Sequence, residues 1–126
     1  MILKMNNLLG FNVFFDEVRA NKLPIKTLFK LTTLGKAIDE KLTFYNEQFQ
    51  EIIKEYALFG EDGNVMKTED GNGIRVKEGM ELECVNKINE LQMLDVELPE
   101  VKFDIEEFGD ISMSLEIFNV ITPFLN

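Results

Sequence analysis

Carboxylates are the most abundant reactive side chains of this chain, which has 23 Asp and Glu, 13 Lys and Arg, and no histidine. Several converging acids, usually with a lysine, are the setting of metal-dependent hydrolysis. Glu97, Glu100 and Asp104, with Lys102 among them, imitate such a set only weakly. No recognised catalytic motif surrounds them, so we predict neither a metal site nor a catalytic carboxylate.

Two turn-forming clusters rich in Asp, Asn and Gly invite a calcium interpretation. An EF-hand loop places acids or amides at positions 1, 3 and 5, glycine at 6 and glutamate at 12. A loop starting at Asp70 fails because Ile74 and Arg75 occupy positions 5 and 6, and one starting at Asp62 fails at Met66. Asp-Gly and Asn-Gly pairs supply the positive φ of tight turns, so turn geometry explains these residues.

Nucleophilic and acid–base catalysis lack their usual side chains in this sequence. The absence of histidine removes the commonest general base and the commonest transition-metal ligand. Cys84 is the one cysteine, and its spacing from Met80, Ile88 and Leu91 places it on the apolar face of a helix. We therefore predict an inert, buried thiol, no cofactor, no metal and a protein that is not an enzyme.

A long helix over residues 24–59 is the element that must position the rest. An apolar residue recurs there every three or four positions, which predicts one amphipathic helix about 50 Å long. Pro24 suits its first turn, and we expect Gly60 to end it as a cap. Gly35 permits either a bend or a close packing contact. The apolar stripe consists of Leu28, Leu31, Leu34, Ile38, Leu42, Tyr45, Phe49, Ile52, Tyr56 and Phe59.

The turns beyond this helix predict that the chain doubles back on itself. Residues 64–67 and 74–77 flank one of the two turn clusters and are expected to pair as a short β-hairpin. Residues 80–94 have helical spacing, and their apolar face would pack on the second half of the long helix. The prediction is a long helix hairpin with a β-hairpin at its tip.

The two ends of the chain add short elements to this hairpin. Residues 2–5 are expected to form an edge strand. The apolar pattern has period two over residues 96–105, which predicts short strands interrupted by a proline. Ser112 or Ser114 caps a C-terminal helix through Ile121, with Leu115, Phe118 and Ile121 facing inward. We predict a single α+β domain over residues 1–126, with the helix hairpin, short strands and a C-terminal helix.

Charge is distributed unevenly along the chain. Residues 1–60 carry eight basic and seven acidic side chains, whereas residues 61–126 carry five and sixteen. A half this acidic repels the nucleic-acid backbone and favours a basic partner surface. The start of the long helix forms a basic face, which either pairs with the acidic half or binds an acidic partner. Its members are Lys22, Lys26, Lys30 and Lys36.

The sequence also bears on the compartment. No apolar run reaches the ~18 residues that a membrane span requires. The first residues lack a charged region followed by a long apolar core, so we expect no signal peptide. One cysteine permits no intrachain disulfide. We expect a cytoplasmic protein that binds neither membrane nor nucleic acid directly.

Three motifs resemble those of a known group of proteins. They are Lys22-Leu23-Pro24-Ile25-Lys26-Thr27 at the start of the long helix, Glu61-Asp62-Gly63-Asn64 and Lys67-Thr68-Glu69-Asp70-Gly71-Asn72-Gly73-Ile74 at the turns, and Val96-Glu97-Leu98-Pro99. In this order they resemble an uncharacterised family of small proteins from tailed phages and prophages of low-GC Gram-positive bacteria. The resemblance spans roughly residues 20–105 and brings no catalytic residues. It implies a phage origin and expression in the host bacterial cytoplasm.

These observations favour a protein that acts by binding. Our first hypothesis is a non-enzymatic phage protein that inhibits a host protein with a basic surface, such as an anti-CRISPR-type inhibitor of host defence. Its acidic surface would imitate nucleic-acid phosphates. The alternatives are a virion assembly protein that forms a homo-oligomer through its helices and a sponge for a small ligand such as a nucleotide. The predicted partner-binding residues are Asp95, Glu97, Glu100, Asp104, Glu106, Glu107 and Asp110.

Overall fold

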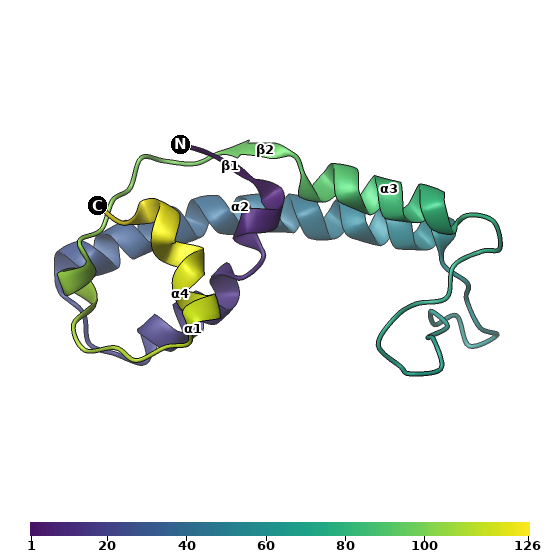
Figure 1. Cartoon of the computed structure of the whole chain (residues 1–126), viewed down its shortest axis with the longest axis horizontal. Coiled ribbons are helices and arrows are strands. Elements are labelled where there is room, and N and C mark those ends of the chain that lie inside the picture. Colours follow the sequence, from purple (N-terminus) through teal and green to yellow (C-terminus); the bar gives the residue numbers. More distant parts are fainter. The chain divides into compact units, whose positions relative to one another are not determined.

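A computed structural model describes residues 1–126 and is an α+β structure with four α-helices and a two-stranded antiparallel sheet (Figure 1). Short 3₁₀ helices cover Met5–Leu8, Ile105–Phe108 and Thr122–Phe124. The chain forms two compact units, Met1–Thr43 with Leu94–Asn126, and Phe44–Met93; the single-domain expectation stays a prediction. The regular elements are β1 Ile2–Lys4, α1 Phe11–Arg19, α2 Ile25–Tyr56, α3 Glu81–Gln92, β2 Asp95–Glu97 and α4 Leu115–Ile121.

Helix α2 confirms the predicted long helix, with 32 residues and no interruption at Gly35. Pro24 precedes its first residue, and the Pro24 carbonyl accepts the first helical bond from Leu28 N at 3.0 Å. Gly35 faces the Phe15 ring, and a Cβ there would lie 3.5 Å from it, at ordinary van der Waals distance. Residues 25–43 of α2 belong to the first unit and residues 44–56 to the second.

The first unit is built on an aromatic core. Phe11 packs edge-on against Phe124 with ring centroids 5.6 Å apart, and Phe14 packs edge-on against Phe108 at 6.0 Å. The Phe103 and Phe108 rings lie 5.3 Å apart. Burial of each such ring stabilises the folded state by roughly 1.5–3 kcal/mol, and each aromatic pair contributes about 1 kcal/mol more. Three elements from distant parts of the sequence are joined in this way.

The sheet of the first unit pairs β1 with β2, which confirms the expected strand at the start of the chain. Leu3 lies opposite Val96, and Lys4 lies opposite Asp95. Val96 is buried while its neighbours Asp95 and Glu97 are exposed, as the period of two predicts. Further along, Phe103 pairs in parallel with Leu125 through an isolated bridge.

The second unit contains an antiparallel pair formed by residues 44–56 of α2 and the whole of α3 (Figure 1). Tyr56 OH donates to Glu83 Oε1 at 2.9 Å near one end of the pair. Gln92 Nε2 donates to Tyr45 OH at 3.4 Å near the other end. Cys84 is buried, which confirms its predicted place on the apolar face.

The prediction that Gly60 ends the long helix is wrong, because α2 already ends at Tyr56. The backbone leaves the helix there to make antiparallel contacts: Leu58 N donates to Arg75 O and Met66 N donates to Leu58 O, both at 2.8 Å. These contacts satisfy the backbone groups that another helical turn would otherwise use. Isolated bridges rather than regular strands result, at Ala57↔Val76, Phe59↔Val65 and Lys67↔Ile74.

Three other assignments of apolar residues are wrong. Phe59, the last residue of the predicted stripe, is exposed. Leu28 is exposed, and Thr27 takes the buried position at the start of the α2 stripe. Leu115 is exposed rather than inward, because α4 buries the side that carries Ile121. The close approach of α4 to Gly10 fixes this orientation, since a Cβ at Gly10 would lie 2.8 Å from Val120 Cγ2. Ser114 caps α4 as predicted, accepting from Ile117 N at 3.3 Å.

Candidate functional site

Residues 95–110, here called the acidic segment, carry all seven predicted partner-binding carboxylates in the first unit. Six of the seven residues are exposed, and the half-buried member is Glu107. The buried residues of the segment alternate with the acids and face the core, which leaves the carboxylates toward solvent. These buried residues are Val96, Leu98, Val101, Phe103 and Phe108.

Several of the carboxylates have partners within the first unit. Asp95 forms an ion pair with Lys4 across the β1–β2 sheet, and Glu100 lies 3.2 Å from the Met1 amino group. Both carboxylates are exposed to solvent, so these ion pairs hold them weakly. Glu97, Asp104, Glu106 and Asp110 have no ion-pair partner within the same unit, and Asp104 accepts a hydrogen bond from the neutral amide of Asn126. Glu97, Glu106 and Asp110 therefore present charges with neither an ion pair nor a side-chain hydrogen bond.

The one lysine of the acidic segment does not form an ion pair with any of its acids. Lys102 Nζ donates to the Pro123 carbonyl at 3.0 Å. This contact ties the segment to the C-terminal 3₁₀ turn and directs the ammonium group to a neutral acceptor. With seven carboxylates and one ammonium group, the segment keeps a net negative charge.

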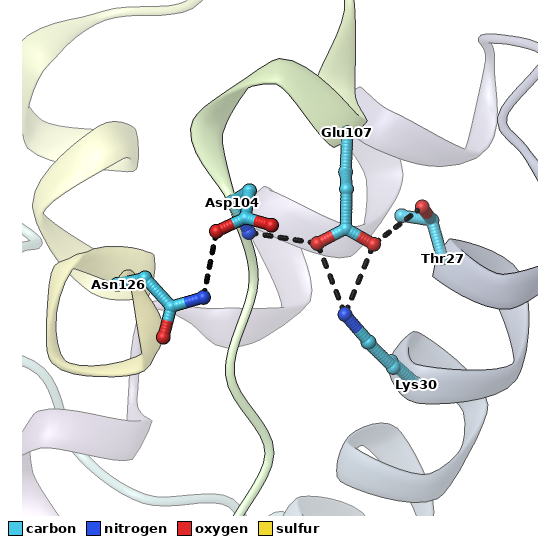
Figure 2. Close-up of polar contacts among 5 residues, drawn as sticks. All are labelled: Thr27, Lys30, Asp104, Glu107 and Asn126. Carbon is cyan, nitrogen blue, oxygen red and sulfur yellow. Dashed lines mark hydrogen bonds and ion pairs between the residues drawn. The ribbon is translucent and has the colours of Figure 1, made fainter.

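Glu107 anchors the acidic segment to α2 through a cluster of hydrogen bonds (Figure 2). Lys30 Nζ donates to both carboxylate oxygens at 3.0 Å, and Thr27 Oγ1 donates to Oε1 at 3.1 Å. Asp104 N donates to Oε2 at 2.7 Å, while Asn126 Nδ2 donates to Asp104 Oδ1 at 2.7 Å. We call these five residues the Glu107 cluster.

The environment of Glu107 favours its ionised form. Partial burial alone would raise the pKa of its carboxyl, because burial disfavours charge. The hydrogen bonds from Asp104 N, Lys30 and Thr27 outweigh this effect and lower the pKa below its ordinary value. The Glu107 side chain is only 19% exposed, so it positions the acidic segment and presents little charge to a partner.

Asp62 and Asp70, the aspartates of the two turn clusters, accept hydrogen bonds from residues of their own turns. Asp62 accepts from Asn64 N at 3.0 Å and from Asn64 Nδ2 at 3.2 Å, and these bonds lower its pKa. Asp70 accepts from Thr68 Oγ1 and from Asn72 N, with the same effect on its pKa. Hydrogen bonding to the charged form explains both shifts. The turn interpretation accounts for both carboxylates.

Groups suited to chemistry do not gather elsewhere. No cluster of three or more Cys, Asp or Glu side chains is arranged to hold a metal ion. Desolvation raises the pKa of the Cys84 thiol, which opposes formation of the reactive thiolate. Burial and the hydrogen bond to Glu83 raise the pKa of Tyr56 to about 12, so this phenol stays protonated at neutral pH.

The sequence analysis missed two features of the first unit. Thr27 is fully buried, and the signal was its spacing of four and seven from Leu31 and Leu34, which puts a polar residue on the buried stripe. The second is a groove between α1 and residues 28–39 of α2, which depends on how two helices pack. The one sequence signal for this groove was the presence of two apolar residues, Ile25 and Phe29, beside the stripe rather than in it; both are exposed.

Comparison with known proteins gives no further support for an assignment, because no protein-family model, curated protein or solved structure matches the chain. In addition, no helix combines the length and the apolar character that crossing a membrane requires.

Proposed function

We propose that this is a non-enzymatic phage protein that binds and inhibits a host protein through the acidic segment, in the host bacterial cytoplasm. A host-defence nuclease or another protein with a basic nucleic-acid groove would be the partner. The observation that carries the proposal is the exposure of six carboxylates on a segment whose one lysine binds a neutral carbonyl. Such a row of negative charge competes with phosphates for a cationic groove.

The way the acidic segment is held supports this function. Pairing with β1 fixes residues 95–97, and the Glu107 cluster fixes the segment about ten residues later. In an extended chain, side chains two residues apart on one face lie roughly 6.6 Å apart. Asp95 and Glu97 have this relation. A held row of charges binds with a smaller loss of conformational entropy than a flexible one.

We divide the predicted residues into two roles. Asp95, Glu97, Glu100, Glu106 and Asp110 would face the partner, whereas Asp104 and Glu107 would hold the segment in place. The finer fold that we propose with this function is the predicted helix hairpin with a β-hairpin tip. The three antiparallel bridges within residues 57–76 support that tip.

The test begins with a tagged copy captured from infected host cells, with the bound proteins identified by mass spectrometry. A host protein recovered in stoichiometric amount would then be titrated against purified protein at low and high salt. We expect an affinity that falls steeply with salt, because the proposed contacts are between exposed charges. Recovery of phage structural proteins alone would favour the virion assembly alternative instead.

Two matched variants separate the acidic segment from net charge. The test variant carries Asp95→Asn, Glu97→Gln, Glu100→Gln, Glu106→Gln and Asp110→Asn. The control variant carries Glu47→Gln, Glu55→Gln, Glu61→Gln, Glu69→Gln and Glu90→Gln, which are exposed in the second unit.

Both variants remove the same charge from a protein of formal net charge −10. We expect the test variant to lose at least ~10-fold in affinity and most of the salt dependence, and the control variant to change little. Equal losses in the two variants, or no loss in the test variant, would contradict the proposal.

A further inference from the structure

A groove lies between α1 and α2, and the proposed function does not use it. Its volume is about 390 Å³, and both of its walls belong to the first unit. Phe15 and Val18 of α1 and Leu31 of α2 form apolar walls. Gly35 also lines it, and the missing side chain there keeps the space beside Phe15 open.

Apolar surface continues from this groove onto the outer face of α2. Leu28, which lines the groove, is exposed, and so are Ile25 and Phe29. Ile25 and Phe29 are four residues apart, so they lie on one face of the helix. A small molecule inside the groove would leave these two side chains in water. A partner long enough to lie along the groove would cover them as well.

Residues 12–39, which span the groove lining, carry five bases and three acids, in contrast to the net charge of −10 for the whole chain. No acid occurs from Arg19 to Ile38, whereas five bases do. One of them, Lys30, is bound to Glu107. The other four, Arg19, Lys22, Lys26 and Lys36, are exposed. Arg19 lies 3.7 Å from Asp16 in an exposed pair that is weak, and Asp39 is the one acid on the groove wall.

The dimensions match a helix. The α2 wall runs from Leu28 to Asp39, which is about 16 Å of helix and therefore about three turns of a partner lying along it. An amphipathic helix that inserts its apolar side chains at i, i+4 and i+7 fills such a groove. Acidic residues on its flanks would meet the basic rim, where the N-terminal end of the α2 dipole adds further positive potential.

We propose that the α1–α2 groove binds an amphipathic, acidic helix of a partner protein. This surface is separate in charge and chemistry from the acidic segment, so the protein carries two binding surfaces of opposite preference. One recognises a basic partner surface and the other an acidic helix. The inference goes beyond the proposed function and does not depend on it.

The probe is a fluorescein-labelled peptide of about 18 residues, with leucine at helical i, i+3, i+4 and i+7 spacing and glutamate at the exposed positions. Fluorescence anisotropy with the full-length protein measures its binding. A peptide of the same composition in scrambled order and a peptide with lysine in place of glutamate are the controls. We expect binding of the acidic amphipathic peptide alone, because it combines the apolar face with the complementary charge.

A pair of single substitutions tests the apolar part of the site. Phe29 is 73% exposed on α2 and Leu82 is 74% exposed on α3 in the other unit, so they are matched in exposure. Phe29→Ser should weaken peptide binding at least ~10-fold, since aromatic anchors dominate such contacts. Leu82→Ser should leave it unchanged. An equal effect of the two substitutions would overturn the assignment of this face.

Charge reversal tests the rim and guards against a misfolded variant. Arg19→Glu with Lys36→Glu should lose the acidic peptide and gain the lysine peptide, a change of preference that only a folded groove can show. Failure to gain the lysine peptide would overturn the proposed role of the rim charges.

Other occupants give distinct outcomes in the same set of measurements. A stable dimer in light scattering that Phe29→Ser dissociates, with no peptide binding, would mean that the groove is an interface between two copies. Binding to phosphatidylglycerol vesicles without peptide binding would mean that the face meets anionic lipid. Either outcome would overturn the acidic-helix proposal, while leaving the acidic segment and its own test unaffected.

Discussion

The two compact units obtain their order in different ways. The first unit buries five phenylalanine rings, and the Glu107 cluster joins the acidic segment to α2 beside them. The second unit buries a smaller apolar set, and tyrosine hydroxyls make polar links near both ends of its helix pair. The difference teaches that the acidic segment belongs to the well-packed part of the molecule. A loop of the second unit with the same charge would be held mainly by turn hydrogen bonds.

The largest effect is expected from opening the aromatic core. Phe103→Ala should lower the free energy of unfolding by roughly 3–5 kcal/mol, because Phe103 is fully buried and its ring packs against that of Phe108. Urea denaturation followed by circular dichroism measures the change. Phe49→Ala in the second unit is the comparison, since Phe49 is half-buried and stacks on Tyr45 at 5.9 Å. A loss as large for Phe49 as for Phe103 would remove the distinction between the units.

A smaller effect is expected from the Glu107 cluster. Glu107→Gln keeps the shape of the side chain but removes the charge that faces Lys30, and should cost about 1–2 kcal/mol at neutral pH. Because the pKa of Glu107 is lowered by folding, its contribution is present above the ordinary value of 4.5 and is lost as pH falls through the lower folded pKa.

Unfolding curves of the wild-type protein and Glu107→Gln from pH 7 to pH 2.5 should therefore converge at the acidic end. Glu106→Gln is the matched control, because Glu106 is an exposed neighbour. A difference between wild type and Glu107→Gln that persists unchanged at pH 2.5 would show that the charge is not what stabilises the cluster.

The smallest effect is expected from the polar links of the second unit. The folded pKa of Tyr56 is raised from 10.0 to about 12, so the folded state holds its proton more tightly than the unfolded state. The stability from this group is complete below pH 10 and decreases as pH rises from about 10 to 12. Tyr56→Phe should remove that alkaline decrease, as measured by thermal unfolding at a series of pH values.

Tyr45→Phe provides the control for this measurement. Tyr45 OH accepts a long hydrogen bond of 3.4 Å from Gln92 and sits in the same helix. Its removal should leave the alkaline decrease in place. If the decrease survives in Tyr56→Phe, another group is responsible and the link to Glu83 is not the cause.

The helices were predicted well from local sequence patterns, because interactions between residues close in sequence determine where a helix forms and which face it buries. The repeat of apolar residues in α2, the Ser114 cap and the buried Cys84 depend on neighbours within a few turns. The end of α2 was misplaced because Gly60 looks like a cap in isolation. Backbone contacts of Leu58 with Met66 and Arg75, which no local pattern records, end the helix earlier.

The candidate site was only partly predictable for the same reason. The run of acids in residues 95–110 is visible in the sequence, and so is the basic face that includes Lys30. The choice of Glu107 as the partner of Lys30 needs the tertiary fold, since the two residues are 77 positions apart. The α1–α2 groove needs the packing of two helices around Gly35, which composition and spacing do not encode.

The pairing of β1 with β2 has a consequence for the order of folding. Lys4 and Asp95 are 91 positions apart, and contacts this distant in sequence form slowly because a long loop must close first. The second unit lies within that loop and is a local hairpin, in which Tyr45 and Gln92 come together over 47 positions. When it forms first, it shortens the effective loop, and each halving of a loop lowers the closure free energy by about 0.6 kcal/mol. We therefore expect the ordered row of negative charge to form late, after the local contacts of the second unit.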